Sequence, residues 1–229
     1  MLNKIKTNIR LSGWWVTLAY ILHRLLSKLP KRSGCYLYFI YEQPLKPPVP
    51  AKMQRPVNNR LSYNWYQEFD QAQLQLPRPV EVLKERFSQQ TQCLLVHQDN
   101  EVAGCAWFAQ QQYLEDEVRC VFDFSHLSES VWDYDIYVFP KYRLSRLFMR
   151  MWKHAEETLY AQGFTRSLSR ITAYNIQSIK SHERLGAKKL SWICFINILG
   201  GQLMFSPMAP YLHLSLSKQS QPRIIIGEK

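Results

Sequence analysis

The chain has 229 residues, 46% of them hydrophobic, so it can bury a sizeable core as one domain with an extension. Its five scattered cysteines, none at CxxC spacing, exclude a disulfide framework and a zinc site and indicate buried, reduced thiols of a cytoplasmic protein. The net charge of +11 is concentrated in residues 1–32, which hold seven Lys and Arg and no acid, so it does not indicate a nucleic-acid-binding protein.

An amphipathic helix is predicted over residues 11–29, where apolar residues recur on one helical face. Arg24, Ser27 and Lys28 interrupt the apolar run, which is too short to span a bilayer, and no signal-peptide cleavage site follows it. Two interpretations stay open. Residues 1–32 bind an anionic membrane surface, as in a peripheral protein of the inner face, or the helix packs on the protein's own core or on a second subunit, as in a homodimer.

Residues 35–124 contain predicted strands, helices and a proline-rich linker. Apolar, β-branched and aromatic runs predict strands at 36–42, 93–97, 102–109 and 118–124, the second and third forming a hairpin. Residues 43–58 hold five prolines and are expected to form a linker. Helices are predicted at 64–73 and 79–90. The acidic run at 115–117 is expected to lie in a solvated loop.

The second half of the chain alternates strands with helices. Strands are predicted at 132–139, 166–173, 188–198 and 210–217, and helices at 141–162 and 176–185. This order predicts an α/β (α+β) fold, in which helices cover both faces of a sheet. We divide the chain into an N-terminal helix at 1–34, a strand and linker at 35–60, a main domain at 61–218 and a tail at 219–229.

Two motifs carry a family resemblance. Residues 135–143 (DIYVFPKYR) resemble the fourth strand of the GCN5-related N-acetyltransferase (GNAT) family and the V-x-P-x-Y-R entry into its pyrophosphate loop. Residues 175–187 (NIQSIKSHERLGA) resemble the family's N-x-x-S-I…H-E-K-L-G-F helix. The resemblance covers about residues 60–200. It implies the GNAT fold, a central mixed, mostly antiparallel twisted sheet, with acetyl-CoA or another acyl-CoA as co-substrate and no metal.

The pyrophosphate loop departs from the family pattern. The family reads Q/R-x-x-G-x-G/A, whereas Arg146 and Phe148 fill the two small positions here. Side chains at these positions can block the close approach of backbone amides to phosphate. Either Arg143 and Arg146 grip the phosphates by charge-assisted hydrogen bonds, or the usual mode of CoA binding is lost.

The resemblance also implies roles for individual residues. His182 stands where many members carry the tyrosine that protonates the leaving thiolate, and it is the candidate general acid. Asp135 and Asp133 are candidate general bases and are predicted to share one face of their strand; a structural or substrate-pairing role is the alternative. The following residues are expected to bind the co-substrate: Tyr137, Val138, Phe139, Arg143, Leu144, Ser145, Arg146, Asn175 and Ser178.

The implied activity is acyl-CoA-dependent N-acyl transfer to a primary amine, which attacks the thioester directly. The acceptor is expected to be a small molecule or a lipid- or saccharide-linked amine, with the reaction placed at the membrane surface if the N-terminal helix binds there. Two alternatives stay open: a long-chain acyltransferase that uses acyl-carrier protein, and a GNAT-like binding module without catalysis.

Overall fold

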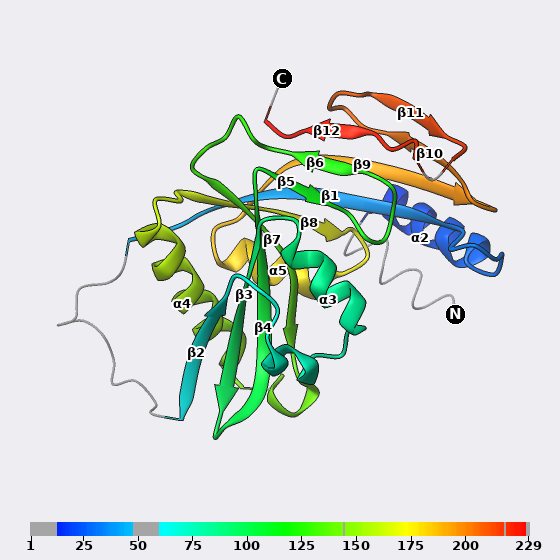
Figure 1. Ribbon diagram of the computed structural model, residues 1–229. Coiled ribbons are helices and arrows are strands. Elements are labelled where there is room, and N and C mark those ends of the chain that lie inside the picture. Colours follow the sequence, from blue (N-terminus) through cyan, green and yellow to red (C-terminus); the bar gives the residue numbers. More distant parts are fainter. Residues whose placement is uncertain (1–12, 48–59, 144, 218, 228–229) are drawn as a thin grey trace. The chain divides into compact units, whose positions relative to one another are not determined.

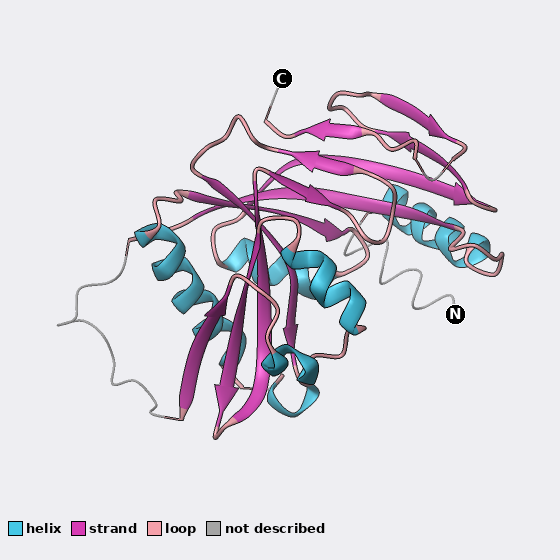
Figure 2. Cartoon of the chain, viewed as in Figure 1, coloured by secondary structure: helices cyan, strands magenta, loops and turns pink. Residues whose placement is uncertain are grey.

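The computed structural model describes residues 13–47, 60–143, 145–217 and 219–227, and these form mixed α/β structure with mostly antiparallel sheets and flanking helices (Figure 1; Figure 2). The chain forms two compact units. Unit 1 holds residues 13–43, Gln112–Phe124 and 168–227, and unit 2 holds residues 44–111 and Ser125–Ser167. No helix in these described ranges is both long and apolar enough to cross a bilayer.

Unit 1 contains five neighbouring strands in the order β11-β10-β9-β1-β8. Their bounds are Gly34–Pro44 for β1, Arg166–Thr172 for β8, Lys188–Ile198 for β9, Gly201–Phe205 for β10 and Leu212–Ser215 for β11. Strands β1, β9, β10 and β11 pair antiparallel. Strand β10 was not predicted, because the two glycines before it mask a short apolar run. Strand β1 corresponds to the strand predicted at 36–42.

Helices α2 (Trp14–Leu26) and α5 (Ile176–Arg184) pack on one apolar cluster of unit 1. Val16 of α2 is buried there together with Cys35, Leu37 and Phe39 of β1. His23 Nδ1 lies 3.0 Å from the carbonyl oxygen of Cys35 and ties the helix to the strand. The N-terminal helix thus packs on the protein's own core, which is one of the two interpretations that the sequence left open.

The apolar side predicted for this helix is largely exposed. Trp14 and Leu18 are 71% and 59% exposed, and Leu25 is 58% exposed, whereas Val16 and Thr17 are buried. The helix buries a narrower stripe of smaller residues, and its leucine-rich side remains at the surface. After packing on the core, the helix therefore still exposes a row of large apolar side chains.

A second, three-stranded sheet in unit 1 joins distant parts of the chain. Strand β6 (Val121–Asp123) pairs antiparallel with β5 (Gln112–Leu114) and parallel with β12 (Arg223–Ile225), so the tail at 219–229 contributes a strand. The acidic run beside this sheet is not a solvated loop as predicted. Glu115 is buried and accepts a 2.8 Å hydrogen bond from Nε of Arg170, whose guanidinium lies 4.5 Å from the ring centre of Tyr38. Because a buried guanidinium requires an acidic partner, the ion pair with Arg170 explains why Glu115 is buried.

Unit 2 is built on four antiparallel strands in the order β7-β4-β3-β2. The strands are β2 (Leu61–Tyr66), β3 (Thr91–Gln98), β4 (Glu101–Gln110) and β7 (Ser130–Val138); the helices are η2 (Gln71–Gln75), α3 (Val80–Phe87), η3 (Pro140–Tyr142) and α4 (Leu147–Ala161). Adjacent residues of β4 face opposite ways. Trp107 packs on Phe87 of α3, with ring centres 5.0 Å apart, and Phe108 packs on Trp152 of α4 at 6.4 Å, so the two helices cover opposite faces.

Two predictions for unit 2 differ from the structure. The helix predicted at 64–73 is wrong, because β2 occupies residues 61–66 and η2 follows. Its alternating pattern places Tyr63 against His154, with ring centres 4.1 Å apart, and Trp65 against Phe108. The predicted hairpin is confirmed, but its strands extend beyond the predicted bounds, to Gln98 and from Glu101. The turn is therefore a tight one of two residues, Asp99 and Asn100, with left-handed φ values of 53° and 68°.

We predict that the two sides of α2 differ sharply in their contribution to stability. Val16→Asp places an unpaired charge in the core cluster and is expected to lower the free energy of unfolding by more than about 3 kcal/mol. Leu25→Asp, on the exposed side of the same helix, is the matched control and should change it by less than about 0.5 kcal/mol. Urea denaturation followed by circular dichroism measures both. Equal losses in the two variants would show that α2 does not pack as described.

Candidate active site

Strand β7 carries a β-bulge in the motif region of unit 2. Its register with β4 shifts between the pair Trp107–Tyr134 and the pair Cys105–Tyr137, so Asp135 and Ile136 stand opposite the single residue Ala106. Asp135 has a φ of 43°, in the left-handed region. A bulge bends a strand and disrupts its hydrogen-bond ladder, and such sites occur next to active sites. Gly104 permits the bend, because a Cβ there would lie 2.8 Å from the Tyr137 carbonyl oxygen.

The Asp135 carboxylate is held by two arginines. Arg78 Nε donates to Oδ2 at 2.9 Å and its Nη2 donates to Oδ1, while Nη1 of Arg86 donates to Oδ2 at 2.5 Å. Arg86 itself lies 5.0 Å from the ring centre of Trp107 and 5.2 Å from that of Tyr134. Burial alone would raise the pKa of Asp135, but the hydrogen bonds from Arg78 and the charge of Arg86 outweigh it and lower the pKa. This carboxylate is therefore a weak base.

The two aspartates do not share one face as predicted. Asp133 pairs directly with Phe108, on the α4 side of the sheet, and its Oδ2 accepts a 2.6 Å hydrogen bond from Ser167 Oγ. Asp135 reaches Arg86 of α3 on the other side. Asp135 is itself a bulged residue, and its left-handed φ breaks the alternation on which the prediction relied.

The segment after β7 turns through η3 and leads to the first turn of α4. Tyr142 is buried and donates to Glu101 Oε2 at 3.0 Å. Nε of Arg143 donates to the Val138 carbonyl oxygen at 3.0 Å. Ser145 Oγ accepts from the Leu147 amide at 3.1 Å and so caps one of the first amides of the helix. The predicted residue Leu144 lies outside the described residues.

Positive charge gathers at the start of α4. Arg143, Arg146 and Arg150 are exposed, and none of them forms an ion pair with the described parts of the chain. The first turn of α4 has no acidic residue. Lys141, by contrast, is neutralised by Glu101 at 2.6 Å. The helix N-terminus carries a partial positive charge of its own, so this region favours an anion.

Tyr137 and Phe139 form the end of β7 beside this loop. Their ring centres are 5.1 Å apart, at an interplanar angle of 79°. The guanidinium carbons of Arg78 and Arg143 lie 5.5 and 5.6 Å from the Tyr137 ring centre. Tyr137 thus links the arginine that holds the bulge to the arginine of the loop.

The remaining predicted site residues belong to unit 1 and lie on α5. Asn175 is the N-cap of the helix, and its Oδ1 accepts from the Ser178 amide at 3.1 Å, so it serves the helix itself. His182 is buried in the last turn, and its carbonyl oxygen accepts from the Leu185 and Ala187 amides, both at 3.0 Å. No three potential metal-ligating side chains gather anywhere in the described ranges.

The sequence of this region matches the acetyltransferase (GNAT) family over residues 60–187, more than half of the chain. The chain therefore belongs to the GNAT acetyltransferase family. No curated protein gave a match.

Solved structures of acetyltransferases are similar to this chain at low sequence identity. An aminoglycoside acetyltransferase from an uncultured soil metagenomic sample, in complex with trehalose, is 10% identical, with a TM-score of 0.41 over 57% of this chain and 90% of its own. A tandem GNAT protein from the clavulanic acid biosynthesis pathway is 10% identical, with a TM-score of 0.45 over 69% and 51%. The aminoglycoside acetyltransferase AAC(6')-Iy, bound to a bisubstrate analogue, is 15% identical, with a TM-score of 0.41 over 55% and 89%.

The partners of Asp135 were not predicted from the sequence. Arg86 follows Leu83 by three positions and so falls on the buried side of α3. A cation on the apolar side of a helix is a signal that an acidic partner is buried nearby. That signal predicts a partner for Arg86 but does not identify Asp135, which lies 49 positions away.

We predict that Asp135→Asn destabilises unit 2. The substitution leaves two arginines without their shared carboxylate and is expected to lower the free energy of unfolding by about 3 kcal/mol. Asp99→Asn, at an exposed turn residue, is the matched control and should change it by less than about 0.5 kcal/mol. Chemical denaturation at neutral pH measures the difference. A fully stable Asp135→Asn variant would contradict the assignment of Asp135 as a positioning residue.

The same ion pairs predict a pH dependence. Because the pKa of Asp135 is lower in the folded than in the unfolded chain, its contribution is present above the unfolded value of about 3.9 and is lost as the pH falls through the folded value. Denaturation midpoints measured from pH 6 down to about pH 3 should therefore converge for the parent and the Asp135→Asn variant. A constant gap between the two curves would count against this linkage.

Proposed function

We propose that the protein transfers an acyl group from acyl-CoA to a primary amine. The observation that carries the proposal is the cluster of three exposed arginines at the start of α4, directly after the bulged strand and inside the region that matches the family. CoA brings a pyrophosphate, which bidentate guanidinium groups bind well. Arg146 is the N-cap residue of α4 and its side chain is exposed, so it is available to a ligand.

The mode of phosphate binding differs from one based on glycines. Ser145 Oγ already engages the Leu147 amide, so fewer backbone amides are left for phosphate. Arginine side chains supply the missing donors, with Arg143 held in place through Nε and its terminal nitrogens left for the ligand. The sequence departure at Arg146 is, in this proposal, an exchange of backbone donors for side-chain donors.

In the proposed reaction the amine nitrogen attacks the thioester carbonyl carbon. The C–N bond forms, the C–S bond breaks, the amine gives up a proton and the CoA thiolate takes one. Backbone amides near the bulge, at Tyr137–Phe139, would polarise the carbonyl. His182 is our candidate for the acid that protonates the thiolate. Asp135 is proposed to hold the bulge in position and not to act as the base, because both its oxygens accept from arginines.

One observation favours a second donor. Because the Ser145 hydroxyl reduces the number of free amides at the helix start, the site also suits acyl-carrier protein, whose prosthetic group carries one phosphate where CoA carries a pyrophosphate and a further phosphate. The same arginines would then face an acidic protein surface. The experiment below separates the two donors.

We predict that acyl-CoA binds to the full chain and that Arg143→Ala and Arg146→Ala each weaken binding about tenfold, the loss of one charge-assisted contact. Pantetheine, which lacks the pyrophosphate, should bind the parent and both variants equally. Arg60→Ala, an exposed arginine of the same unit, is the matched control. Titration calorimetry at low salt provides the affinities. If no CoA species binds but acyl-carrier protein supports turnover, the second donor is correct; if neither does, the catalytic proposal fails.

We also predict that His182→Gln lowers the rate of acyl transfer by about 10²–10⁴-fold with little change in CoA affinity, as for loss of a general acid. His126→Gln, at an exposed histidine, should keep the parent rate. Release of free thiol in single-turnover reactions, together with calorimetric CoA affinity, separates the chemical step from binding. An unchanged rate in the His182 variant would remove it from the reaction.

A further inference from the structure

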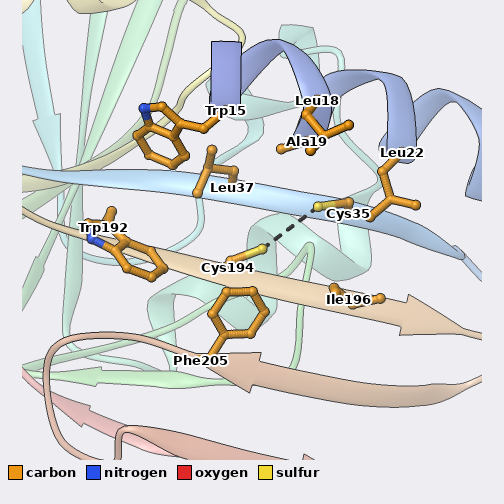
Figure 3. A pocket seen from close by; sticks show the side chains of 10 residues that line it. All are labelled: Trp15, Leu18, Ala19, Leu22, Cys35, Leu37, Trp192, Cys194, Ile196 and Phe205. Atoms are coloured by element: carbon orange, nitrogen blue, oxygen red, sulfur yellow. Dashed lines mark hydrogen bonds between the residues drawn. The ribbon is translucent and has the colours of Figure 1, made fainter. Parts of the chain in front are cut away.

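An apolar pocket of about 390 Å³ lies within unit 1, between α2 and the face of strands β1, β9 and β10 (Figure 3). Its ten lining residues are aliphatic or aromatic apart from the thiols of Cys35 and Cys194, which lie 3.7 Å apart. Figure 3 shows Leu18 and Leu22 of the helix above the strands that form the floor. The volume falls in the range of small-ligand sites, roughly 300–1,000 Å³.

The lining determines what kind of ligand fits. Trp15 and Trp192 meet edge-on at 6.2 Å between ring centres, and Trp192 meets Phe205 at 6.0 Å. Among the residues that the structure describes, no charged or amide side chain lines the pocket to orient a polar ligand. Polar groups placed there would lose their hydration without compensation. The part of a ligand that enters must therefore be a hydrocarbon.

The strand register extends this apolar surface beyond the helix. Directly paired residues of antiparallel strands lie on one face of the sheet. Two such rows run from the pocket to the edge strand, one through Leu37, Cys194, Phe205 and Leu212 and the other through Cys35, Ile196, Leu203 and Leu214. Leu212 and Leu214 are 67% and 61% exposed. The pocket is thus continuous with an exposed apolar strip, a feature typical of an interaction surface.

Charge around this surface is mostly positive. Apart from Glu42, which stands opposite Lys188 near the end of β1, helix α2 and the strands β1, β9, β10 and β11 contain no Asp or Glu. Arg24 is exposed on α2, and Lys28 and Lys31 are exposed in the turn that follows the helix. Lys189 Nζ lies 4.5 Å from the ring centre of Phe39, whose own ring centre is 5.7 Å from that of Trp15 in the pocket wall. The surface therefore suits an anionic partner.

We propose that this pocket takes one hydrocarbon chain of an anionic membrane phospholipid. The exposed leucines of α2 and β11 lie in the interface of the bilayer. The cations contact the lipid headgroups, and each cation that is close to the membrane surface strengthens the binding of the protein to it. The lipid chain fills the space between Trp15 and Phe205. This inference concerns unit 1 alone and does not depend on acyl transfer.

The test uses the full chain and vesicles of phosphatidylglycerol with brominated chains. Bromine quenches tryptophan fluorescence on contact, so a chain in the pocket should quench Trp15 and Trp192, and Trp192→Phe should remove part of the quenching. Co-sedimentation measures the affinity of the protein for the vesicles. This affinity should fall at least about tenfold in the double variant Arg24→Glu/Lys28→Glu, because the electrostatic attraction is lost. The parent protein should show a similar loss on neutral phosphatidylcholine vesicles.

Pocket-filling variants separate the pocket from the surface of the helix. Ala19→Phe adds a ring from the α2 side, and Ile196→Phe adds one from β9 and serves if the first variant does not fold. Either should abolish the Trp192 component of quenching, while the protein still sediments with the vesicles. Leu74→Phe, at an exposed leucine of η2 in unit 2, is the matched control and should keep that component.

Three results would overturn the proposal. Vesicle binding with the Trp192 component intact in both filled variants would show that no chain enters. Quenching by monomeric brominated fatty acid without any binding of vesicles would identify a soluble amphiphile as the ligand. A concentration-dependent dimer that the filled variants dissociate, seen by analytical ultracentrifugation, would identify a second copy of the chain as the occupant.

Discussion

The conformation of the bulge in β7 depends on one carboxylate. Asp135 stands at a left-handed φ of 43°, which an L-residue adopts only at a cost, and Arg78 and Arg86 secure it from outside the strand. Gly104 on the neighbouring strand leaves room for the displaced backbone. The bulge in turn aims Tyr137 at the arginine-rich start of α4. The buried ion pairs, the lack of a side chain at Gly104 and the strained backbone of Asp135 thus act together to orient the motif.

In unit 1, helix α2 contacts the protein core on one side and is exposed at the surface on the other. Val16 and Thr17 are buried and Leu22 packs on the core cluster, whereas Leu18 and Leu25 remain largely exposed. A globular helix usually buries its largest apolar side chains, because burial of their area provides most of the stabilisation. Helix α2 follows this rule only in part, and in our proposal its exposed leucines contact the bilayer.

Most elements could be predicted from the sequence, because their periodicity is local. The stripe of α4 and the runs of β7 and β9 are present as patterns within each segment, and so is the family motif. Apart from the helix predicted at 64–73, where the alternating pattern of β2 was missed, what failed depended on distant residues. The bulge at Asp135, which turns this side chain away from the face of Asp133, arises from pairing with β4, and the partner of Glu115 is Arg170, 55 positions away. The short strands β5, β10 and β12 are stable only as part of a sheet, so no local pattern identified them.

The pairing of β1 with β9 has a consequence for synthesis. Cys35 and Cys194 are in contact although 159 positions separate them, whereas strands β3 and β4 of unit 2 are joined by a two-residue turn. As the chain leaves the ribosome, β1 emerges 159 positions before the strand with which it pairs. At about 5–20 residues per second, β1 waits for roughly ten seconds or more with its apolar face uncovered. We therefore expect unit 1 to be the later unit to fold and the one that most needs a chaperone during translation.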